Sequence, residues 1–189
     1  MTGVSVIILA AGSSSRMGSP KQLLRWKDET LLGHAIRTAM ASKAVHTYVV
    51  LGSNEDAHRR AIQKFPVTLV VNKDWAKGMG SSLKAGIRAA AESSGALLVM
   101  TCDMPFVTSQ HLDNLIGADQ DVAASQYNNA AGVPALFGRN LFNELLSIDD
   151  TAGAKKIIEK YRTAAALVHL DMPTDLDTPE DYQKALSAD

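Results

Sequence analysis

Cysteine is nearly absent from this chain, which has a single one, Cys102, among its 189 residues. Neither a disulfide within the chain nor a metal cluster held by several cysteines can form. A lone cysteine suits a reducing compartment, and we expect a cytoplasmic protein. Hydrophobic residues make up 46% of the chain, which is enough for a sizeable core without disulfides or a structural metal. We therefore expect residues 1–189 to fold as one domain.

An excess of charge of either sign is missing as well. The chain has 19 Lys and Arg against 20 Asp and Glu, a net charge of −1. Such a chain has no bulk field to attract nucleic acid or an anionic membrane, so we expect neither partner. The apolar run from Val4 to Ala11 is far too short to span a bilayer, and the N-terminus lacks the basic region of a secretion signal. Any polyanionic ligand has to be bound by local groups.

Apolar runs and helical patterns alternate regularly in the first half of the chain. Val4–Ala10 is almost wholly apolar, as in a strand buried on both faces of a parallel sheet. Apolar residues recur at spacings of three and four from Leu31 to Met40, which predicts a helix that Thr30 can cap. Further strands are predicted at 47–51, 67–71 and 96–101, and further helices at 57–64 and 82–92. This alternation predicts an α/β fold with a mostly parallel sheet.

The pattern is looser in the second half of the chain. We expect helices at 109–116, 141–146 and 154–161 and strands at 122–125, 135–137 and 166–170. A last helix is predicted to begin at Thr178-Pro179-Glu180-Asp181. There the threonine can cap, the proline can occupy the first helical position, and the acids can fill the first turn.

The loop after the first strand, residues 11–21, has the composition of a phosphate site. Ligands of open α/β sheets bind beyond the carboxyl ends of the strands. Ala11 and Gly12 let a ligand approach the backbone, the three consecutive serines at 13–15 offer hydroxyl and N–H groups, and Arg16 and Lys21 supply cations. The spacing fits neither the P-loop nor the G-x-G-x-x-G fingerprint, which disfavours an ATPase or a dinucleotide enzyme. A solvent-exposed turn with two incidental cations is the alternative.

A carboxylate follows the strand predicted at 96–101. Cys102-Asp103-Met104-Pro105 places Asp103 at the carboxyl end of that strand, on the same rim as the glycine-rich loop. Mg²⁺ prefers one or two carboxylates together with phosphate oxygens and water. Asp103 is therefore chemically sufficient to recruit a magnesium–nucleotide complex, although an aspartate before Met-Pro is also ordinary turn chemistry.

The tract LAAGSSSRMGSPKQLL, residues 9–24, resembles the signature loop of the MobA-like NTP transferases, a branch of the nucleotide-diphospho-sugar transferase fold. Its Ala10-Ala11-Gly12 start is similar to the molybdenum cofactor cytidylyltransferase group, whereas the guanylyltransferase group typically has AGG. CDMPFV resembles the family motif whose aspartate, here Asp103, is a magnesium ligand. The resemblance covers residues 4–182. It implies a three-layer α/β/α sandwich, Rossmann-like, whose mostly parallel sheet has an antiparallel excursion.

Two more segments extend the resemblance on the nucleotide side. DLDTPEDY, residues 175–182, resembles the closing motif of the family and implies Asp177 as the second metal ligand, with Asp175 as the alternative. Ordinary helix-start chemistry is the other explanation for these acids. Residues 72–83 resemble the segment that lies over the nucleoside, with Ser82 near the base.

The match is weaker on the acceptor side. Residues 132–137 resemble the acceptor-side segment of the family, but Val133 stands where a histidine is usual. The downstream G-D-x-G-A pattern appears in altered form at residues 149–154. These departures leave the identity of the acceptor open.

The resemblance implies roles for twelve residues. Catalysis falls to Lys21, Arg16 and Asp103, and metal binding to Asp103 and Asp177. The nucleotide-binding set is Leu9, Ala10, Ala11, Gly12, Ser13, Arg16, Lys21, Asn72, Gly78, Ser82 and Asp103.

The activity implied is Mg²⁺-dependent transfer of CMP from CTP to the terminal phosphate of a (molybdo)pterin, with release of pyrophosphate. The product would serve molybdenum hydroxylases such as xanthine dehydrogenase. The acceptor phosphate is already an anionic nucleophile, so no general base is required. The alternatives are GTP as donor, a sugar or polyol phosphate as acceptor, and a chaperone that binds cofactor without chemistry.

Overall fold

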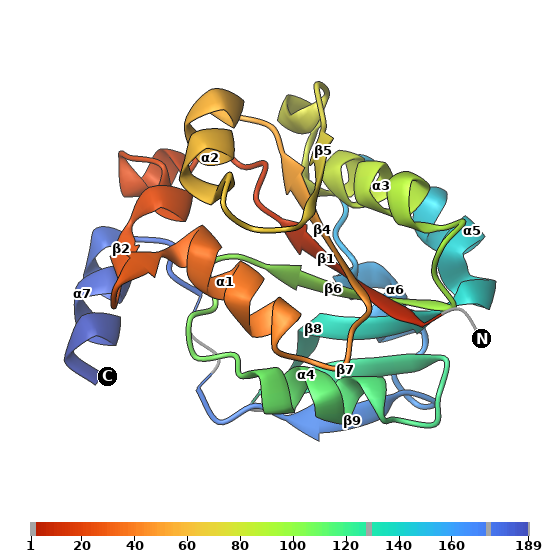
Figure 1. Cartoon of the computed structure of the whole chain (residues 1–189). Coiled ribbons are helices and arrows are strands. Elements are labelled where there is room, and N and C mark those ends of the chain that lie inside the picture. Colours follow the sequence, from red (N-terminus) through yellow and green to blue (C-terminus); the bar gives the residue numbers. More distant parts are fainter. Residues whose placement is uncertain (1–2, 128–129, 173–174, 189) are drawn as a thin grey trace.

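The computed structural model describes residues 3–127, 130–172 and 175–188. A seven-stranded sheet in the order β5-β4-β1-β6-β8-β7-β9 forms its centre (Figure 1). The strands are β1 (Val4–Leu9), β4 (His46–Leu51), β5 (Thr68–Val71), β6 (Ala96–Thr101), β7 (Val122–Tyr127), β8 (Ala130–Gly138) and β9 (Ala166–His169). β8 is antiparallel to its neighbours β6 and β7, and the other pairs are parallel. The predicted mostly parallel sheet with an antiparallel excursion is confirmed.

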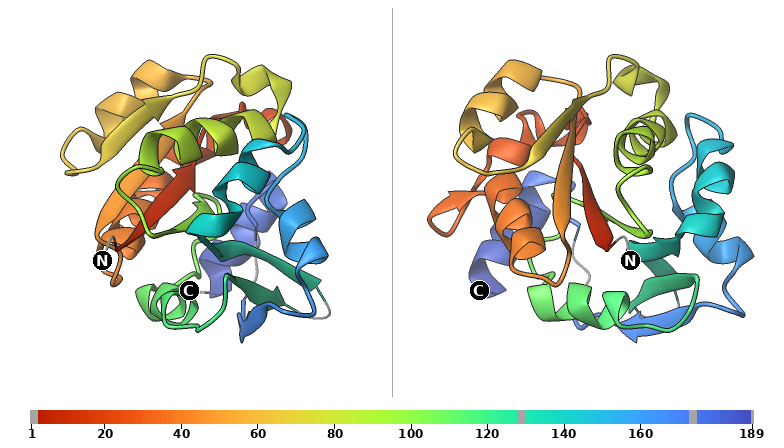
Figure 2. Two further views of the ribbon diagram at one scale, coloured as in Figure 1. Left: turned by 90° about the vertical axis from the view of Figure 1, so that its right-hand side faces the viewer. Right: turned by 45° about the vertical axis from the view of Figure 1, so that its right-hand side comes forward.

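Helices cover both faces of the sheet and make three layers (Figure 2). One face carries α1 (Leu31–Met40), α2 (Glu55–Ile62) and α4 (Ser109–Ile116), and the other carries α3 (Met79–Ala90), α5 (Phe142–Leu146) and α6 (Lys155–Lys160). Successive residues of a strand point to opposite faces. Val6 and Ile8 of β1 therefore join the core that includes α1, and Ile7 and Leu9 join the core that includes α3. Burial on both faces explains the unbroken apolar run of β1.

Several predicted elements have the expected bounds and caps. α1, β6 and α4 begin and end at the predicted residues. The Thr30 hydroxyl accepts a hydrogen bond from the Gly33 N–H at 3.0 Å and caps α1. At the start of α7 (Pro179–Ala188), the Thr178 N–H donates to the Asp181 carboxylate at 3.0 Å and the Asp181 N–H donates to the Thr178 hydroxyl at 3.2 Å. This reciprocal pair satisfies N–H groups that an uncapped helix leaves free.

Strand β8 is longer than the sequence predicts, since it begins at residue 130 rather than 135. Proline has no N–H group for a ladder, so Pro134 argues against a strand at its position. The pairing with β7 shifts its register at this point, so that Pro134 is not paired. Ala124 lies opposite Ala135, but the next residue, Ser125, lies opposite Gly132. The irregularity leaves Val133 and Pro134 out of the register and lets the strand continue.

Two helices begin earlier than predicted, and one hairpin was not predicted. α2 begins at Glu55 rather than residue 57, and α3 begins at Met79 rather than residue 82. The start of α3 was predicted too late because Gly78 and Gly80 lower the helix propensity of this segment. A hairpin of β2 (Arg25–Trp26) and β3 (Glu29–Thr30) precedes α1. Strands of two residues are too short to show a period.

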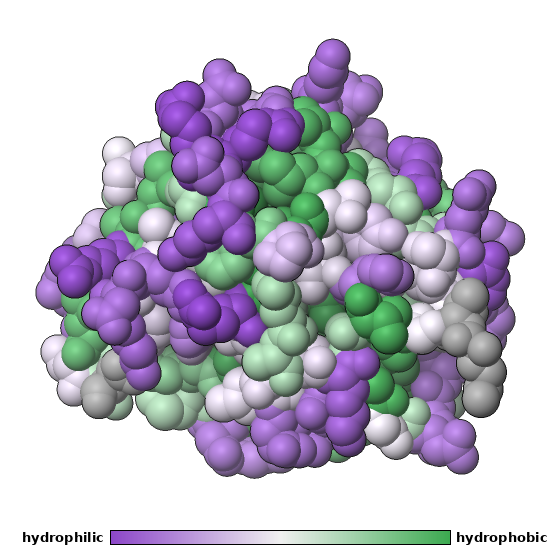
Figure 3. Space-filling view, viewed as in Figure 1, coloured by the Kyte–Doolittle hydropathy of each residue, from purple (hydrophilic) through white to green (hydrophobic). Residues whose placement is uncertain are grey.

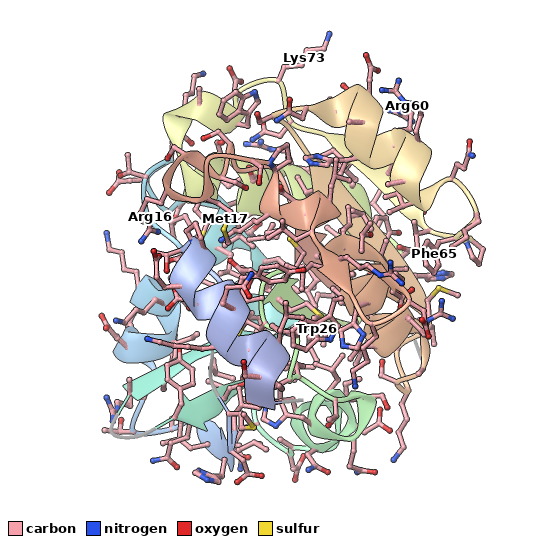
Figure 4. All side chains as sticks on the ribbon, turned by 90° about the vertical axis from the view of Figure 1, so that its left-hand side faces the viewer. Arg16, Met17, Trp26, Arg60, Phe65 and Lys73 are labelled. Atoms are coloured by element: carbon pink, nitrogen blue, oxygen red, sulfur yellow. The ribbon has the colours of Figure 1, made fainter. Side chains whose placement is uncertain are left out.

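A third apolar cluster lies beside the sheet and joins distant parts of the chain. Its buried members are Met17, Trp26, Leu31, Leu176 and Ala185. Figure 4 shows Arg16 and Met17 beside the start of α7, with Trp26 near the same helix. The segment before α7 is therefore held against the loop that follows β1.

The strand at one edge of the sheet, β5, is only partly covered. Thr68 is exposed and the other three residues of β5 are half-buried. Figure 3 shows polar side chains over α2 and apolar ones gathered beside it, towards β5. No helix in the described part of the chain is long and apolar enough to cross a membrane.

Candidate functional site

The loop between β1 and α1 folds back on itself. It contains two short 3-10 turns, at Ser15–Met17 and Lys21–Leu23. Ser14 has φ 55° and Gly18 has φ 71°, both in the left-handed region that turns a chain sharply. The fold-back brings Lys21 to the carboxyl ends of β1 and β6, where Asp103 follows β6.

A cavity of about 370 Å³ opens between this loop and the loop before α3. Nine of the twelve predicted site residues line it: Leu9, Ala10, Ala11, Gly12, Ser13, Lys21, Gly78, Ser82 and Asp103. The rest of its lining is Gln22, Trp75, Ala76, Met79, Thr101 and Cys102. Arg16, Asn72 and Asp177 are not part of the wall. The structure thus brings together segments separated by up to 94 positions, from residue 9 to residue 103.

A larger hollow of about 620 Å³ lies at the opposite rim of the sheet, beside the start of β7. Asp119 and Asp121 are among its lining residues, and none of the lining residues is Lys, Arg or His. A polyanion would meet carboxylates there without a cation to balance it. The smaller cavity is therefore the better site for a nucleotide.

Lys21 bridges the two predicted metal ligands. Its Nζ lies 2.5 Å from Asp103 Oδ2 and 2.8 Å from Asp177 Oδ1. Burial opposes the charge of this ammonium group, but the two carboxylates outweigh burial and raise the pKa of Lys21. The same contacts hold the pKa of Asp177 below its usual range, with the Lys21 hydrogen bond as the main cause. Lys21 and Asp177 are therefore both charged at neutral pH.

The carboxylates fit a hard divalent cation. Asp103 Oδ1 is buried and has no hydrogen-bond partner among the residues that the structure describes, whereas Oδ2 accepts from Lys21. A buried carboxylate oxygen without a hydrogen-bond partner is stabilised when a cation binds to it. No group of three or more metal-binding side chains occurs in the described ranges. Asp103 and Asp177 alone match Mg²⁺ held by one or two carboxylates plus phosphate oxygens and water.

Asp177 is better placed than Asp175 to act with Asp103. Asp177 also accepts from Arg16 at 2.8 Å, and the Leu176 N–H before it donates to the Asp103 carbonyl at 2.9 Å. Asp175 is exposed at the surface. Desolvation on its protein side and the charges of Asp103 and Asp177 raise the pKa of Asp175 to about 6. Geometry thus groups Asp177 with the cations and leaves Asp175 outside.

Asn72 lies beneath the cavity wall. Its Nδ2 donates to the hydroxyls of Ser81 and Ser82 at 2.8 and 2.9 Å, and its Oδ1 accepts from the Asp74 N–H at 3.0 Å. The side chain is 6% exposed. Asn72 therefore positions Ser82, which does line the cavity.

Residues 149–153 pack tightly against the start of α3. A Cβ on Gly80 would lie 2.2 Å from the Asp149 carbonyl oxygen and 2.5 Å from that of Ala152. Lys84 of α3 forms an ion pair with Asp150 and donates to the Ile148 carbonyl at 3.1 Å. The altered acceptor-side motif is thus fixed to the loop that lines the cavity.

Sequence reasoning missed Gln22 and Lys84. Gln22 follows a lysine of the signature loop and looks like a solvated polar residue, yet it is 1% exposed. Lys84 lies between Leu83 and Ala85 in α3, and its partner Asp150 is distant in sequence. Only the tertiary fold brings these contacts together.

The lysine held between two carboxylates, beside a cavity at the strand ends of this α/β fold, is what is expected of a nucleotidyltransferase. The chain belongs to the MobA-like NTP transferase family, whose domain matches residues 6–166.

Relatives of the chain match it over lengths that range from about half of it to nearly all of it. Purine catabolism protein PucB of Bacillus subtilis strain 168 is 30% identical over 93% of this chain and 92% of that protein. Nicotine blue oxidoreductase of Paenarthrobacter nicotinovorans is 39% identical over 54% of this chain and 50% of that protein. Molybdenum cofactor cytidylyltransferase of Escherichia coli K12 is 25% identical over 96% of this chain and 95% of that protein.

A solved structure supports the fold along the whole chain. The crystal structure of Rv0371c from Mycobacterium tuberculosis H37Rv, a complex with manganese, matches with a TM-score of 0.85. The two sequences are 27% identical, and the match covers 100% of both chains.

Proposed function

We propose that this nucleotidyltransferase moves CMP from CTP to the terminal phosphate of a (molybdo)pterin and releases pyrophosphate, with Mg²⁺ as its metal. The observation that carries the proposal is the cluster of Lys21, Asp103 and Asp177 beside the cavity. The cluster combines a cation for phosphate oxygens with carboxylates for a metal. The cytidylyltransferase among the relatives and the Ala10-Ala11-Gly12 start of the loop favour CTP over GTP.

The chain's own residues supply positioning and charge. Asp103 and Asp177 would hold Mg²⁺, which would supply positive charge to neutralise the phosphate oxygens. The acceptor phosphate oxygen attacks the α-phosphorus, and the bond from that phosphorus to the oxygen of the leaving pyrophosphate breaks. Lys21 and Arg16 stabilise the charge that builds on the pyrophosphate. No proton has to be removed from the acceptor, because its attacking phosphate oxygen is already anionic.

The nucleoside is assigned to the wall formed by the start of α3 and the end of β1. Gly78 and Ser82 line the same cavity as Leu9 and Ala10. Trp75 also lines the cavity and is half-buried against the core, so its ring both closes the wall and offers a surface for stacking. Asn72 contributes through Ser82 rather than by touching the nucleotide.

Delivery of the product to a molybdenum hydroxylase such as xanthine dehydrogenase completes the proposal. The relative named as a purine catabolism protein is consistent with such a recipient. The other candidates are GTP transfer, transfer to a sugar or polyol phosphate, and a chaperone that carries cofactor without chemistry.

Pyrophosphate release by the purified chain tests the proposal. The assay uses molybdopterin as acceptor and compares CTP, GTP and ATP, each with Mg²⁺, with Mn²⁺ and with excess EDTA. We expect release with CTP that needs both the acceptor and the metal. Faster release with GTP, or release only with a sugar phosphate, would replace the donor or the acceptor. A chaperone would bind and deliver cofactor without release, and its delivery would survive Asp103→Ala.

A further inference from the structure

Gln22 is a buried amide whose polar atoms are all used within the glycine-rich loop. Its Nε2 donates to the Gly12 carbonyl at 2.8 Å and to the Ala10 carbonyl at 3.3 Å, and its Oε1 accepts from the Ser14 hydroxyl at 3.1 Å. The residue is 1% exposed. One side chain thus ties the beginning of the loop to its end.

The same network holds the backbone of Lys21. The Ser14 Oγ, which donates to Gln22, accepts from the Lys21 N–H at 3.1 Å. Ser14 has φ 55°, a left-handed conformation that is unfavourable for a residue with a side chain. Such a conformation persists where surrounding contacts over-determine it. Gln22 provides one of these contacts and so fixes where the Lys21 side chain begins.

The carbonyl contacts also decide which way the loop's peptide groups face. In a trans peptide the C=O of one residue and the N–H of the next point in opposite directions. Because the Ala10 and Gly12 carbonyls face Gln22, the N–H groups of Ala11 and Ser13 point away from it. The N–H groups of Ala11 and Ser13 find no acceptor in the described part of the chain. Two carbonyl oxygens that would repel a phosphate are occupied, and N–H donors stay available.

We propose that Gln22 is a positioning residue that holds the glycine-rich loop and Lys21 in their phosphate-binding arrangement. This inference rests on the proposed function only in that the loop binds the polyphosphate of a nucleotide. It does not depend on which base or acceptor is used. An amide is required at residue 22, because this side chain donates two hydrogen bonds and accepts one.

Gln22→Glu tests the requirement at nearly constant volume. The carboxylate has no N–H groups, and its oxygens would face the Ala10 and Gly12 carbonyls. Gln22→Met keeps the length without any hydrogen bond, and Ser14→Ala removes only the link to Lys21. Ser94→Ala is the control, since Ser94 is buried, donates to Ser5 at 2.7 Å and lies outside the site.

Isothermal titration of the full chain with Mg²⁺–tripolyphosphate, a probe without a base, and with Mg²⁺–CTP gives the readout. We expect Gln22→Glu to weaken binding of both probes by about 10-fold to 100-fold. Gln22→Met should have a smaller effect and Ser14→Ala the smallest, while Ser94→Ala binds as the wild type does despite its lower thermal midpoint. The same order should appear in KM for the nucleotide.

The outcomes separate this inference from the proposed function. Wild-type chain that binds neither probe overturns both, because the loop is then not a polyphosphate site. Wild-type chain that binds both probes while folded Gln22→Glu and Gln22→Met bind them equally well overturns the role of Gln22 alone. If Gln22→Glu does not fold, Gln22→Met and Ser14→Ala decide by the same comparison.

Discussion

The two halves of the sheet differ in how they serve the site. In the half made of β5, β4, β1 and β6, all strands are parallel and their carboxyl ends meet at one rim. In the half made of β8, β7 and β9, β8 runs the other way, so its carboxyl end lies at the opposite rim. The parallel half supplies most of the cavity wall. The mixed half supplies Asp177 and the packed residues 149–153. In the proposed function, phosphate chemistry therefore falls mainly to regular strand ends, and the acceptor side to irregular segments.

The largest expected effect is at the carboxylate that ends β6 in the parallel half. Asp103→Asn keeps the shape but removes the charge that faces Lys21 and that, in the proposed function, holds the metal. We expect turnover to fall by about 100-fold to 1,000-fold, while the unfolding midpoint stays near that of the wild type. Steady-state pyrophosphate release and circular dichroism melts measure the two.

The matched control for this change is Asp175→Asn, just after β9. Asp175 lies outside the contacts of Lys21 and Arg16, so its replacement should lower turnover far less than Asp103→Asn or Asp177→Asn. Equal losses of turnover in Asp175→Asn and Asp177→Asn would show that the assignment of Asp177 as the second metal ligand is wrong.

The close packing of Gly80 against residues 149–153, where the two halves meet, predicts that a larger residue at position 80 destabilises the fold. In Gly80→Ala the added Cβ would meet the backbone oxygens of Asp149 and Ala152 at 2.2 and 2.5 Å. Backbone cannot move aside as a flexible side chain does, so we expect a loss of about 1–3 kcal/mol in the free energy of unfolding. Urea unfolding measures it. Gly117→Ala is the control, because its nearest atom is at 3.3 Å and its φ is −80°; a similar loss there would refute the steric reason.

A glycine inside the site should behave in the opposite way. Nothing lies within 4 Å of a Cβ built on Gly12, so Gly12→Ala should change the free energy of unfolding by no more than about 0.5 kcal/mol. The added methyl group would occupy space that the account gives to phosphate. We expect a raised KM for the nucleotide with unchanged stability. A variant that is destabilised but binds normally would contradict this.

The smallest effect concerns two buried histidines, one beside each half. Burial lowers the pKa of His58 in α2, and the Ser53 backbone only partly offsets it. Burial is also the main cause that lowers the pKa of His111 in α4, whose ring is 2.7 Å from the Ser125 hydroxyl. The unfolded chain takes up these protons near pH 6.5, whereas the folded chain takes them up only at lower pH. Stability is therefore complete above about pH 6.5 and falls as the pH drops below it.

Single replacements separate the two histidines. His58→Leu should reduce the fall in the free energy of unfolding at acid pH. It should change that free energy little at pH 7, because no well-aligned hydrogen bond holds either ring nitrogen within the described residues. His111→Leu should also reduce this fall, but it should lower the free energy of unfolding at pH 7, because the contact with Ser125 is lost. Urea unfolding at several pH values measures both, and a slope unchanged in His58→Leu would exclude it as a source.

The sequence predicted the parallel half better than the mixed half for physical reasons. Strands buried on both faces leave unbroken apolar runs, so β1 and β6 were placed nearly to the residue. β8 was shortened because Pro134 is a poor strand residue and the compensating irregularity opposite Ser125 depends on a partner strand. In the site, Asp103 could be predicted because it ends such a run. Gln22 could not, because its burial depends on where the loop folds back.

Transfer of the α-phosphate of CTP is the most direct measurement of the central claim. With CTP labelled at the α-phosphate, purified wild-type chain, Mg²⁺ and molybdopterin, we predict that the label moves into the acceptor in equal amount to the pyrophosphate released. The same chain with Asp103→Asn should show almost no transfer while it remains folded. Label that stays in CTP or appears only in free CMP with the wild type, or transfer that persists in folded Asp103→Asn, would contradict the account.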